Sequence, residues 1–128
     1  MIDTSKAFSG FAVNDVQAAR RFYEEVLGMT VAEQYGMLQL TVANGAQVLV
    51  YPKPNHQPAT FTVLNFVVDD VEATVDDLTG QGVKFEHYDM PEIKTDSKGI
   101  SRDDSGQGPS AIAWFTDPAG NIVSLIQQ

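Results

Sequence analysis

Few side chains in this chain of 128 residues could act as nucleophiles, bases or metal ligands. There are two histidines and no cysteine, which excludes disulfides, thiolate metal sites and cysteine nucleophiles. His87 and Asp89 are two residues apart and share one face of an expected strand, with Glu86 on the opposite face. This spacing occurs in some metal sites, but two donors without a partner cluster are more typical of a solvated strand edge. The Asp69-Asp70 pair precedes an expected helix, where capping explains it. No catalytic triad and no phosphate-binding glycine loop can be argued from these residues.

An internal repeat indicates the elements that must position the remaining candidates. Residues 11–18 (FAVNDVQA) and 66–73 (FVVDDVEA) are identical at five of eight positions, at a constant offset of 55. In both copies an apolar run leads to an expected N-cap, Asn14 or Asp69, with Gln17 or Glu72 three residues later as in a capping box. Both expected helices end at a glycine. The pattern predicts two copies of one supersecondary unit.

Short runs with strand alternation surround each helix. The expected strands are residues 7–13, 30–34, 37–42 and 46–51 in the first copy and 60–68, 83–88, 111–116 and 121–126 in the second. The predicted fold class is therefore α+β, with two β-α-β-β-β modules. We expect a single domain, 1–128, made of an N-terminal module (1–52), a proline-containing linker (53–58) and a C-terminal module (59–128).

One segment does not fit this pattern. Residues 91–109 are polar and contain several glycines and prolines. The segment is longer than structureless loops in compact domains usually are. It is either a lid over a binding site or a disordered loop, and the sequence supports both interpretations equally.

Two motifs connect the chain to a known family. Residues 22–28 read FYEEVLG and residues 114–121 read WFTDPAGN, a hairpin whose turn chemistry is architectural. With the two β-α-β-β-β units, these motifs resemble the vicinal oxygen chelate superfamily, which includes glyoxalase I, extradiol dioxygenases, and bleomycin- and fosfomycin-resistance proteins. The resemblance covers nearly the whole chain. It implies that each module curls a mixed sheet into a half-cup and that two modules enclose a ligand.

The resemblance also locates the positions at which metal-dependent members carry their ligands. These positions fall on Phe8, Leu49, Val63 and Ser124. Three of the four are hydrocarbon side chains, and one serine hydroxyl cannot hold a divalent ion that needs four or more donors. No His, Asp or Glu lies within two residues of any of them. We therefore expect no metal and no cofactor.

Strand alternation predicts which residues line the expected cup. The lining is apolar and aromatic with a few polar atoms, as in many small-molecule sites. The expected ligand-binding residues are Phe8, Gln47, Tyr51, Asn65, Trp114 and Ser124. The alternative interpretation is that these residues close on one another as a second core or a dimer seam.

Three functions follow from these observations. The first is a metal-independent protein that binds or sequesters a small apolar or aromatic molecule; the net charge of −9 favours a cationic one. The second is an enzyme of the same superfamily, of lyase, transferase or dioxygenase type, that lacks the usual metal site or has relocated ligands. The third is a non-catalytic dimeric module with a filled cup. We favour binding over catalysis and expect a homodimer.

Charge and hydropathy restrict the remaining partners. The acidic balance argues against nucleic acid, whose phosphates require basic side chains. No apolar run approaches the roughly 18 residues of a membrane span, and the first residues have no signal-peptide core. The sequence therefore predicts a cytoplasmic protein with no membrane partner.

Overall fold

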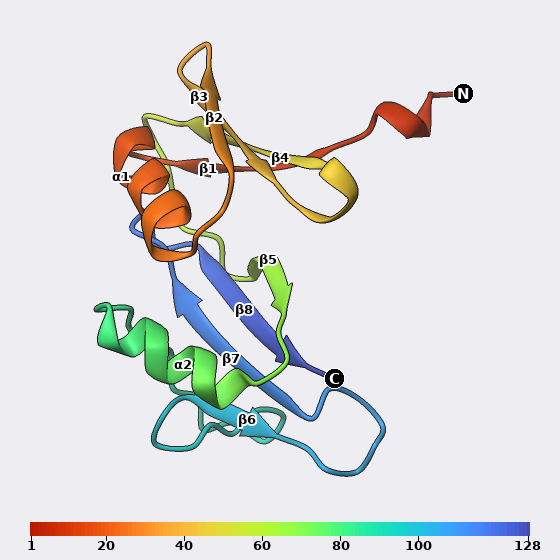
Figure 1. Cartoon of the computed structure of the whole chain (residues 1–128), viewed down its shortest axis with the longest axis vertical. Helices are drawn as coiled ribbons and strands as arrows, with labels where there is room; N and C mark the ends of the chain where they lie inside the picture. Colours follow the sequence, from red (N-terminus) through yellow and green to blue (C-terminus); the bar gives the residue numbers. More distant parts are fainter. The chain divides into compact units, whose positions relative to one another are not determined.

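The computed structural model describes residues 1–128 and has an α+β fold (Figure 1). The chain forms two compact units, Met1–Pro58 and Ala59–Gln128. Each unit contains one four-stranded mixed sheet and one principal helix. No helix is long and apolar enough to cross a membrane.

The first unit is built on the sheet order β1-β4-β3-β2. Its elements are η1 (Thr4–Lys6), β1 (Ser9–Val13), α1 (Val16–Arg21), the π-helical turn η2 (Phe22–Val26), β2 (Val31–Gln34), β3 (Met37–Thr41), η3 (Ala43–Gly45) and β4 (Gln47–Pro52). β1 runs parallel to β4, and the other two pairings are antiparallel. The tight turn before β4 contains Asn44 and Gly45, both with positive φ, as the Asn-Gly pair predicts.

Alternate residues of this sheet form the core of the first unit. Phe11, Val13, Leu38, Leu40, Val48 and Val50 are buried. Tyr23, from the π-helical turn, is fully buried beside them, with its ring 5.9 Å from that of Phe11. The residues between them therefore face away from the helix, and this second face is the open face of the first sheet.

The second unit repeats the arrangement with the order β5-β8-β7-β6. Its elements are β5 (Thr62–Val67), α2 (Val71–Gly80), β6 (Ile100–Arg102), β7 (Ala111–Thr116) and β8 (Ile122–Gln127). β5 runs parallel to β8, and the other pairings are antiparallel. Val71, Val75 and Leu78 of α2 are buried, as are Phe115 and Val123 of the sheet. The face that α2 does not cover is the open face of the second sheet.

The prediction of a strand at residues 83–88 is wrong. This segment lies beside β7 but makes only one bridge, Phe85 with Phe115, and one further hydrogen bond, from Glu86 N to Trp114 O at 2.8 Å. The chain then turns away, and β6 pairs with the other half of β7, Ile100 opposite Ala113. Two separate segments share one edge of β7, so neither forms a long strand there.

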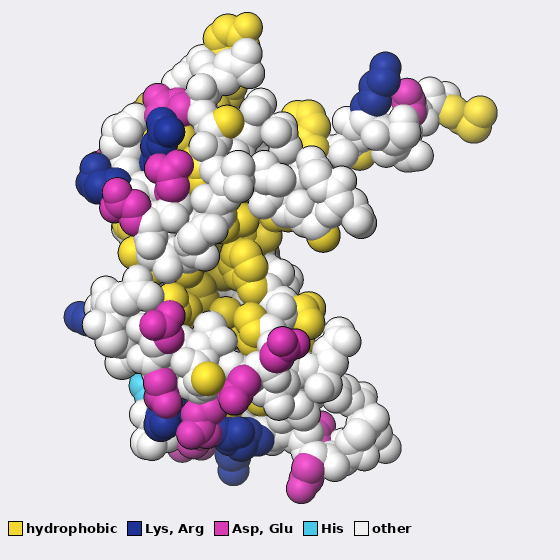
Figure 2. Space-filling view, viewed as in Figure 1, with side chains coloured by type: hydrophobic (Ala, Val, Ile, Leu, Met, Phe, Trp, Pro, Cys, Tyr) yellow, Lys and Arg dark blue, Asp and Glu magenta, His cyan; other side chains and the backbone are white.

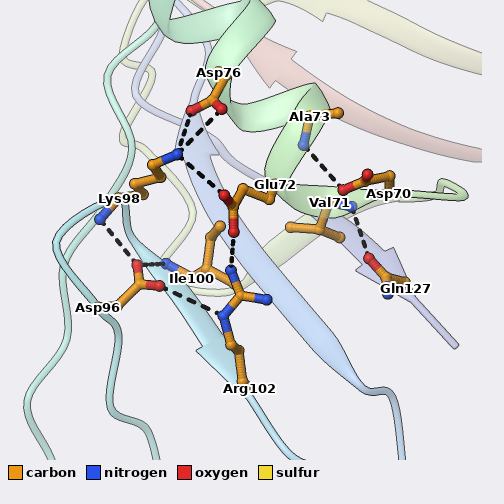
Figure 3. A network of polar contacts seen from close by, with 10 residues as sticks. All are labelled: Asp70, Val71, Glu72, Ala73, Asp76, Asp96, Lys98, Ile100, Arg102 and Gln127. Atoms are coloured by element: carbon orange, nitrogen blue, oxygen red, sulfur yellow. Dashed lines mark hydrogen bonds and ion pairs between the residues drawn. The ribbon is translucent and has the colours of Figure 1, made fainter.

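Both helix caps lie one residue later than predicted. Asp15 and Asp70, rather than Asn14 and Asp69, are the N-caps, and their side chains accept hydrogen bonds from Ala18 N and Ala73 N. The capping boxes do not form: Gln17 instead donates to Glu33. Gln127 supplies a second cap for α2, because its side-chain oxygen accepts from Val71 N at 2.8 Å (Figure 3).

The middle of the 91–109 segment, residues 96–102, is attached to α2 (Figure 3). Lys98 forms ion pairs with Glu72 and Asp76 of α2, and Arg102 forms ion pairs with Glu72 and Asp96. Figure 2 shows the corresponding surface, where acidic and basic side chains lie next to one another over α2. The segment is therefore attached to the helix through its charged side chains.

The WFTDPAGN hairpin is held by its own side chains, as its sequence predicts. Asp117 is buried, and one carboxylate oxygen accepts from Ala119 N and Asn121 N, both at 2.9 Å. The side-chain oxygen of Asn121 accepts from Ala59 N. Gly120 has a φ of +83°, so the turn needs glycine at that position. The hairpin fixes the start of β8 and hence the position of Ser124.

Candidate functional site

The open face of the second sheet brings three predicted site residues into one row. In the strand register, Asn65 of β5 lies opposite Ser124 of β8, and Ser124 lies opposite Trp114 of β7. Directly opposed side chains on neighbouring strands are in reach of one another. The structure therefore places these three residues side by side across three strands.

A hydrogen bond joins two of them. Ser124 is 1% exposed, and its hydroxyl donates to the side-chain oxygen of Asn65 at 2.5 Å. Asn65 itself is exposed. The serine thus fixes the orientation of the Asn65 amide, while the amide remains accessible on the open face.

The row continues with two residues that were not predicted as site residues. Because Phe85 bridges Phe115 in the antiparallel sense, the next residue, Glu86, lies opposite Trp114. Tyr88 packs edge-on against Trp114, with ring centroids 5.4 Å apart and planes at 80°. Burial, together with the nearby charge of Glu86, raises the pKa of the Tyr88 hydroxyl above its ordinary value of 10.0. Alternation along residues 83–88 could have found both residues once Trp114 had been identified as their neighbour.

The other three predicted site residues belong to the first unit. Phe8, which is 70% exposed, and Gln47 line a cavity of about 330 Å³ together with Gln39 and Leu49. These strand residues lie on the open face of the first sheet. Tyr51 lies on the same face of β4 but does not line that cavity. The first unit therefore carries a cavity of mixed lining, in which Phe8 and Leu49 lie beside two side-chain amides and Lys6.

The structure shows the strand partners of the positions that the resemblance associates with metal ligands. Leu49 lies opposite Gly10 in the first sheet, and Ser124 lies opposite Asn65 in the second. Val63 lies at an irregularity in the β5–β8 register. No group of three or more His, Cys, Asp or Glu side chains is arranged to hold a metal ion. The only side-chain donor at these four positions is the hydroxyl of Ser124, with the Asn65 amide beside it, and these two groups do not form a recognisable metal site.

His87 and Asp89 do not form a cluster of donors. His87 is exposed and lines a cavity of about 560 Å³ beside α2, together with Lys84 and Lys98. Asp89 forms an isolated bridge with Lys94. The same cavity is also lined by Asp76, but no group of three or more metal donors forms there.

Comparisons with known proteins agree with this architecture. The family model of the Glyoxalase/Bleomycin resistance protein/Dioxygenase superfamily matches residues 7–125. A search of curated proteins gave no significant match.

Among solved structures, the chain is similar to the fosfomycin resistance protein FosX from Listeria monocytogenes. The TM-score is 0.72 at 14% identity, covering 100% of this chain and 95% of that one. It is also similar to lactoylglutathione lyase from Agrobacterium tumefaciens (TM-score 0.67, 18% identity, 99% and 96% covered). A third relative is TnmS3, an antibiotic-binding protein from Streptomyces sp. CB03234 (TM-score 0.63, 24% identity, 95% of each chain covered). At these identities the structural matches establish the fold alone, whereas the family model covers almost the whole sequence. The chain belongs to the glyoxalase/bleomycin resistance protein/dioxygenase superfamily.

Proposed function

We propose that this protein binds an apolar or aromatic small molecule, preferably a cation, and does not turn it over. The observation that carries the proposal is the row of Asn65, Ser124 and Trp114 on the open face of the second sheet. An aromatic ring of the ligand that stacks on Trp114 gains about 1 kcal/mol of binding free energy beyond the free energy that comes from burying its area. The neighbouring amide orients polar groups of the ligand.

Binding on this face needs no metal. The serine hydroxyl already donates to Asn65, and Phe8, Leu49 and Val63 have no lone pair to offer. A metal-assisted reaction depends on a Lewis acid held beside the substrate. The residue types at these positions favour a binding site over a Lewis-acid site.

The relatives support a binding role by analogy. TnmS3 is described as an antibiotic-binding protein, and a second neighbour from the same Streptomyces strain as a glyoxalase/bleomycin resistance protein. Both share 24% of their residues with this chain. A small organic antibiotic is therefore the first class of ligand to test.

We also propose that the protein is a homodimer. Ile2 is 87% exposed beside an exposed Met1 at the start of the chain, an apolar surface that a second copy can cover. Light scattering after gel filtration should then give about twice the chain mass of 13.9 kDa. A mass of one chain at micromolar concentration would rule this out.

Fluorescence titration tests the binding proposal. Trp114 is the only tryptophan, so its emission should change when a planar aromatic cation or a bleomycin-type antibiotic binds. Calorimetry should show that Trp114→Phe weakens binding, since phenylalanine offers less stacking area. Phe8→Ala reports separately on the cavity of the first unit.

Tyr35→Asn is the matched control for these variants. Tyr35 is 86% exposed at the tip of the β2–β3 hairpin, with a φ of +57° that asparagine tolerates. Its replacement should leave binding unchanged. Binding that survives both Trp114→Phe and Phe8→Ala would place the site elsewhere, and turnover of a bound compound would identify an enzyme instead.

A further inference from the structure

The row on the second sheet has two chemically different ends. Asn65 on β5 marks one end, and Glu86 beside β7 marks the other, with Ser124 and Trp114 between them. The four side chains occupy four neighbouring backbone segments of the same face. Adjacent strands are about 4.8 Å apart, so the two ends are separated by about 14 Å.

The Asn65 end presents hydrogen-bond donors. Its side-chain oxygen is occupied by the hydroxyl of Ser124. The amide NH₂ group of this exposed residue makes no hydrogen bond within the protein, so both N–H bonds remain available. This end favours a carbonyl or another acceptor on the ligand.

The Glu86 end presents a carboxylate without a counter-ion. Glu86 is half-buried, and its carboxylate forms no ion pair and no hydrogen bond. By contrast, the acidic residues over α2, Glu72 and Asp76, are both paired with Lys98. A partly buried carboxylate beside the Tyr88–Trp114 aromatic pair favours a positively charged group.

We infer that the site selects elongated aromatic cations that carry a hydrogen-bond acceptor at the end remote from the charge. The aromatic body stacks on Trp114 and passes over the buried Ser124, the acceptor meets the Asn65 amide, and the cationic nitrogen meets Glu86. This inference rests on the proposed binding function and specifies its ligand class. It also assigns Glu86, which neither the family resemblance nor strand alternation had identified, as the residue that recognises charge.

A set of three aromatic probes tests the inference. The first probe has a carbonyl and a protonated amine nitrogen about 10–15 Å apart; the second lacks the charge, and the third lacks the carbonyl. Binding to the protein is followed by Trp114 fluorescence and calorimetry. We expect the first probe to bind most tightly.

Two near-isosteric variants then locate each contact. Glu86→Gln should weaken binding of the charged probes by roughly 10- to 100-fold, the range for a hydrogen bond to a charged group, and leave the uncharged probe unchanged. Asn65→Asp keeps an acceptor for Ser124 but removes the donors and adds a charge, so it should weaken binding of the first probe relative to the third, which has the same charge but no carbonyl. Glu92→Gln, which removes one exposed charge outside the row, is the matched control.

The outcomes separate this inference from the proposed function. If no aromatic probe binds the wild-type protein, the binding function itself fails. If the probes bind but Glu86→Gln and Glu92→Gln affect them equally, the function stands and the assignment of Glu86 is overturned. Equal weakening of all three probes by Asn65→Asp would overturn the assignment of the acceptor end.

Discussion

Gly99 lies where the structure leaves no room for a side chain. Its φ is +87°, and an added Cβ atom would come within 2.9 Å of the Glu86 carbonyl oxygen and 3.0 Å of the Phe85 Cβ. Both the backbone conformation and the close approach therefore require glycine. We predict that Gly99→Ala lowers the free energy of unfolding by about 2 kcal/mol, measured by equilibrium denaturation in urea.

Gly108→Ala is the control for that prediction. Gly108 is exposed, its φ is not positive, and an added Cβ would meet nothing within 4 Å. Its replacement should change stability by less than about 0.5 kcal/mol. If the two alanine variants were equally stable, the close packing of Gly99 against residues 85 and 86 would be refuted. Because the added Cβ would press on the backbone of Glu86, Gly99→Ala should also weaken ligand binding at the row of Asn65, Ser124, Trp114 and Glu86.

Individual site residues differ in how far the sequence predicts them. Asn65, Trp114 and Ser124 can be placed on one face because alternation fixes the two faces of any strand. Their contact depends on the register between strands, which the structure supplies. Glu86 and Tyr88 escape prediction because the sequence does not specify that residues 83–88 lie beside β7. Whether any of these residues binds a ligand stays a prediction.

The helix caps give a prediction at the scale of one element. Asp70 accepts from Ala73 N and adopts an extended conformation, whereas Asp69 makes no such contact. Asp70→Ala should therefore lower the free energy of unfolding by about 1 kcal/mol, because a backbone N–H of α2 loses its partner. Asp69→Ala, one residue earlier, should have little effect. Urea denaturation of both variants distinguishes the two positions, and a larger effect for Asp69→Ala would contradict the observed cap.

Most helices and strands can be predicted from the sequence, and the errors at the helix caps and at β6 each have a physical reason. The repeat identifies both β-α-β-β-β units because hydrophobic period and capping residues recur together. The caps are misplaced by one residue because Asn14-Asp15 and Asp69-Asp70 each offer two adjacent capping side chains. β6 is missed because Ile100–Arg102 is a short strand inside a polar segment, attached to α2 by ion pairs. Such charged contacts over long sequence distances leave no periodic signal.

Asp96 gives that charged attachment a pH dependence. Partial burial opposes its ionisation, but hydrogen bonds from Ile100 N and Lys98 N and the charge of Arg102 hold the pKa of its carboxyl below its ordinary value of 3.8. A carboxyl with a lower pKa in the folded state stabilises the protein above the unfolded pKa, and this contribution is lost as the pH falls below it. The stability difference between wild type and Asp96→Asn should therefore be constant above about pH 5 and shrink below pH 3.8.

Denaturation of both proteins at a series of pH values tests this behaviour. The comparison removes the contributions of other carboxyl groups, such as Asp3 and Asp103, whose pKa values hydrogen bonds from Ser5 and Ser105 also lower. A stability difference that stays constant down to acidic pH would show that the Asp96 contacts do not depend on its charge.

At the scale of the whole chain, the two units are built alike but carry different polar side chains. Gly10 and Asn65 occupy the same position of the repeat, and their strand partners are Leu49 and Ser124. The first pair has no polar side chain, whereas the second is a hydrogen-bonded pair. The polar chemistry of this row therefore belongs to the second unit, although both units share one topology.

The net charge of −9 belongs to the molecule as a whole and predicts how cationic ligands approach it. Long-range attraction acts mainly on the association rate, whereas a local contact such as the one proposed for Glu86 acts mainly on dissociation. Raising the ionic strength from about 0.01 M to about 1 M shortens the screening length from about 30 Å to about 3 Å. The association rate constant of a cationic probe should then fall roughly tenfold or more, measured by stopped-flow fluorescence of Trp114. An uncharged analogue should show no such fall.

The Glu86→Gln variant separates the long-range field from the local contact. Its association rate should keep most of the salt dependence, because the substitution removes one charge of many. Its dissociation rate for the cation should rise. A salt dependence confined to dissociation would show that capture depends on the local carboxylate and not on the field of the whole molecule.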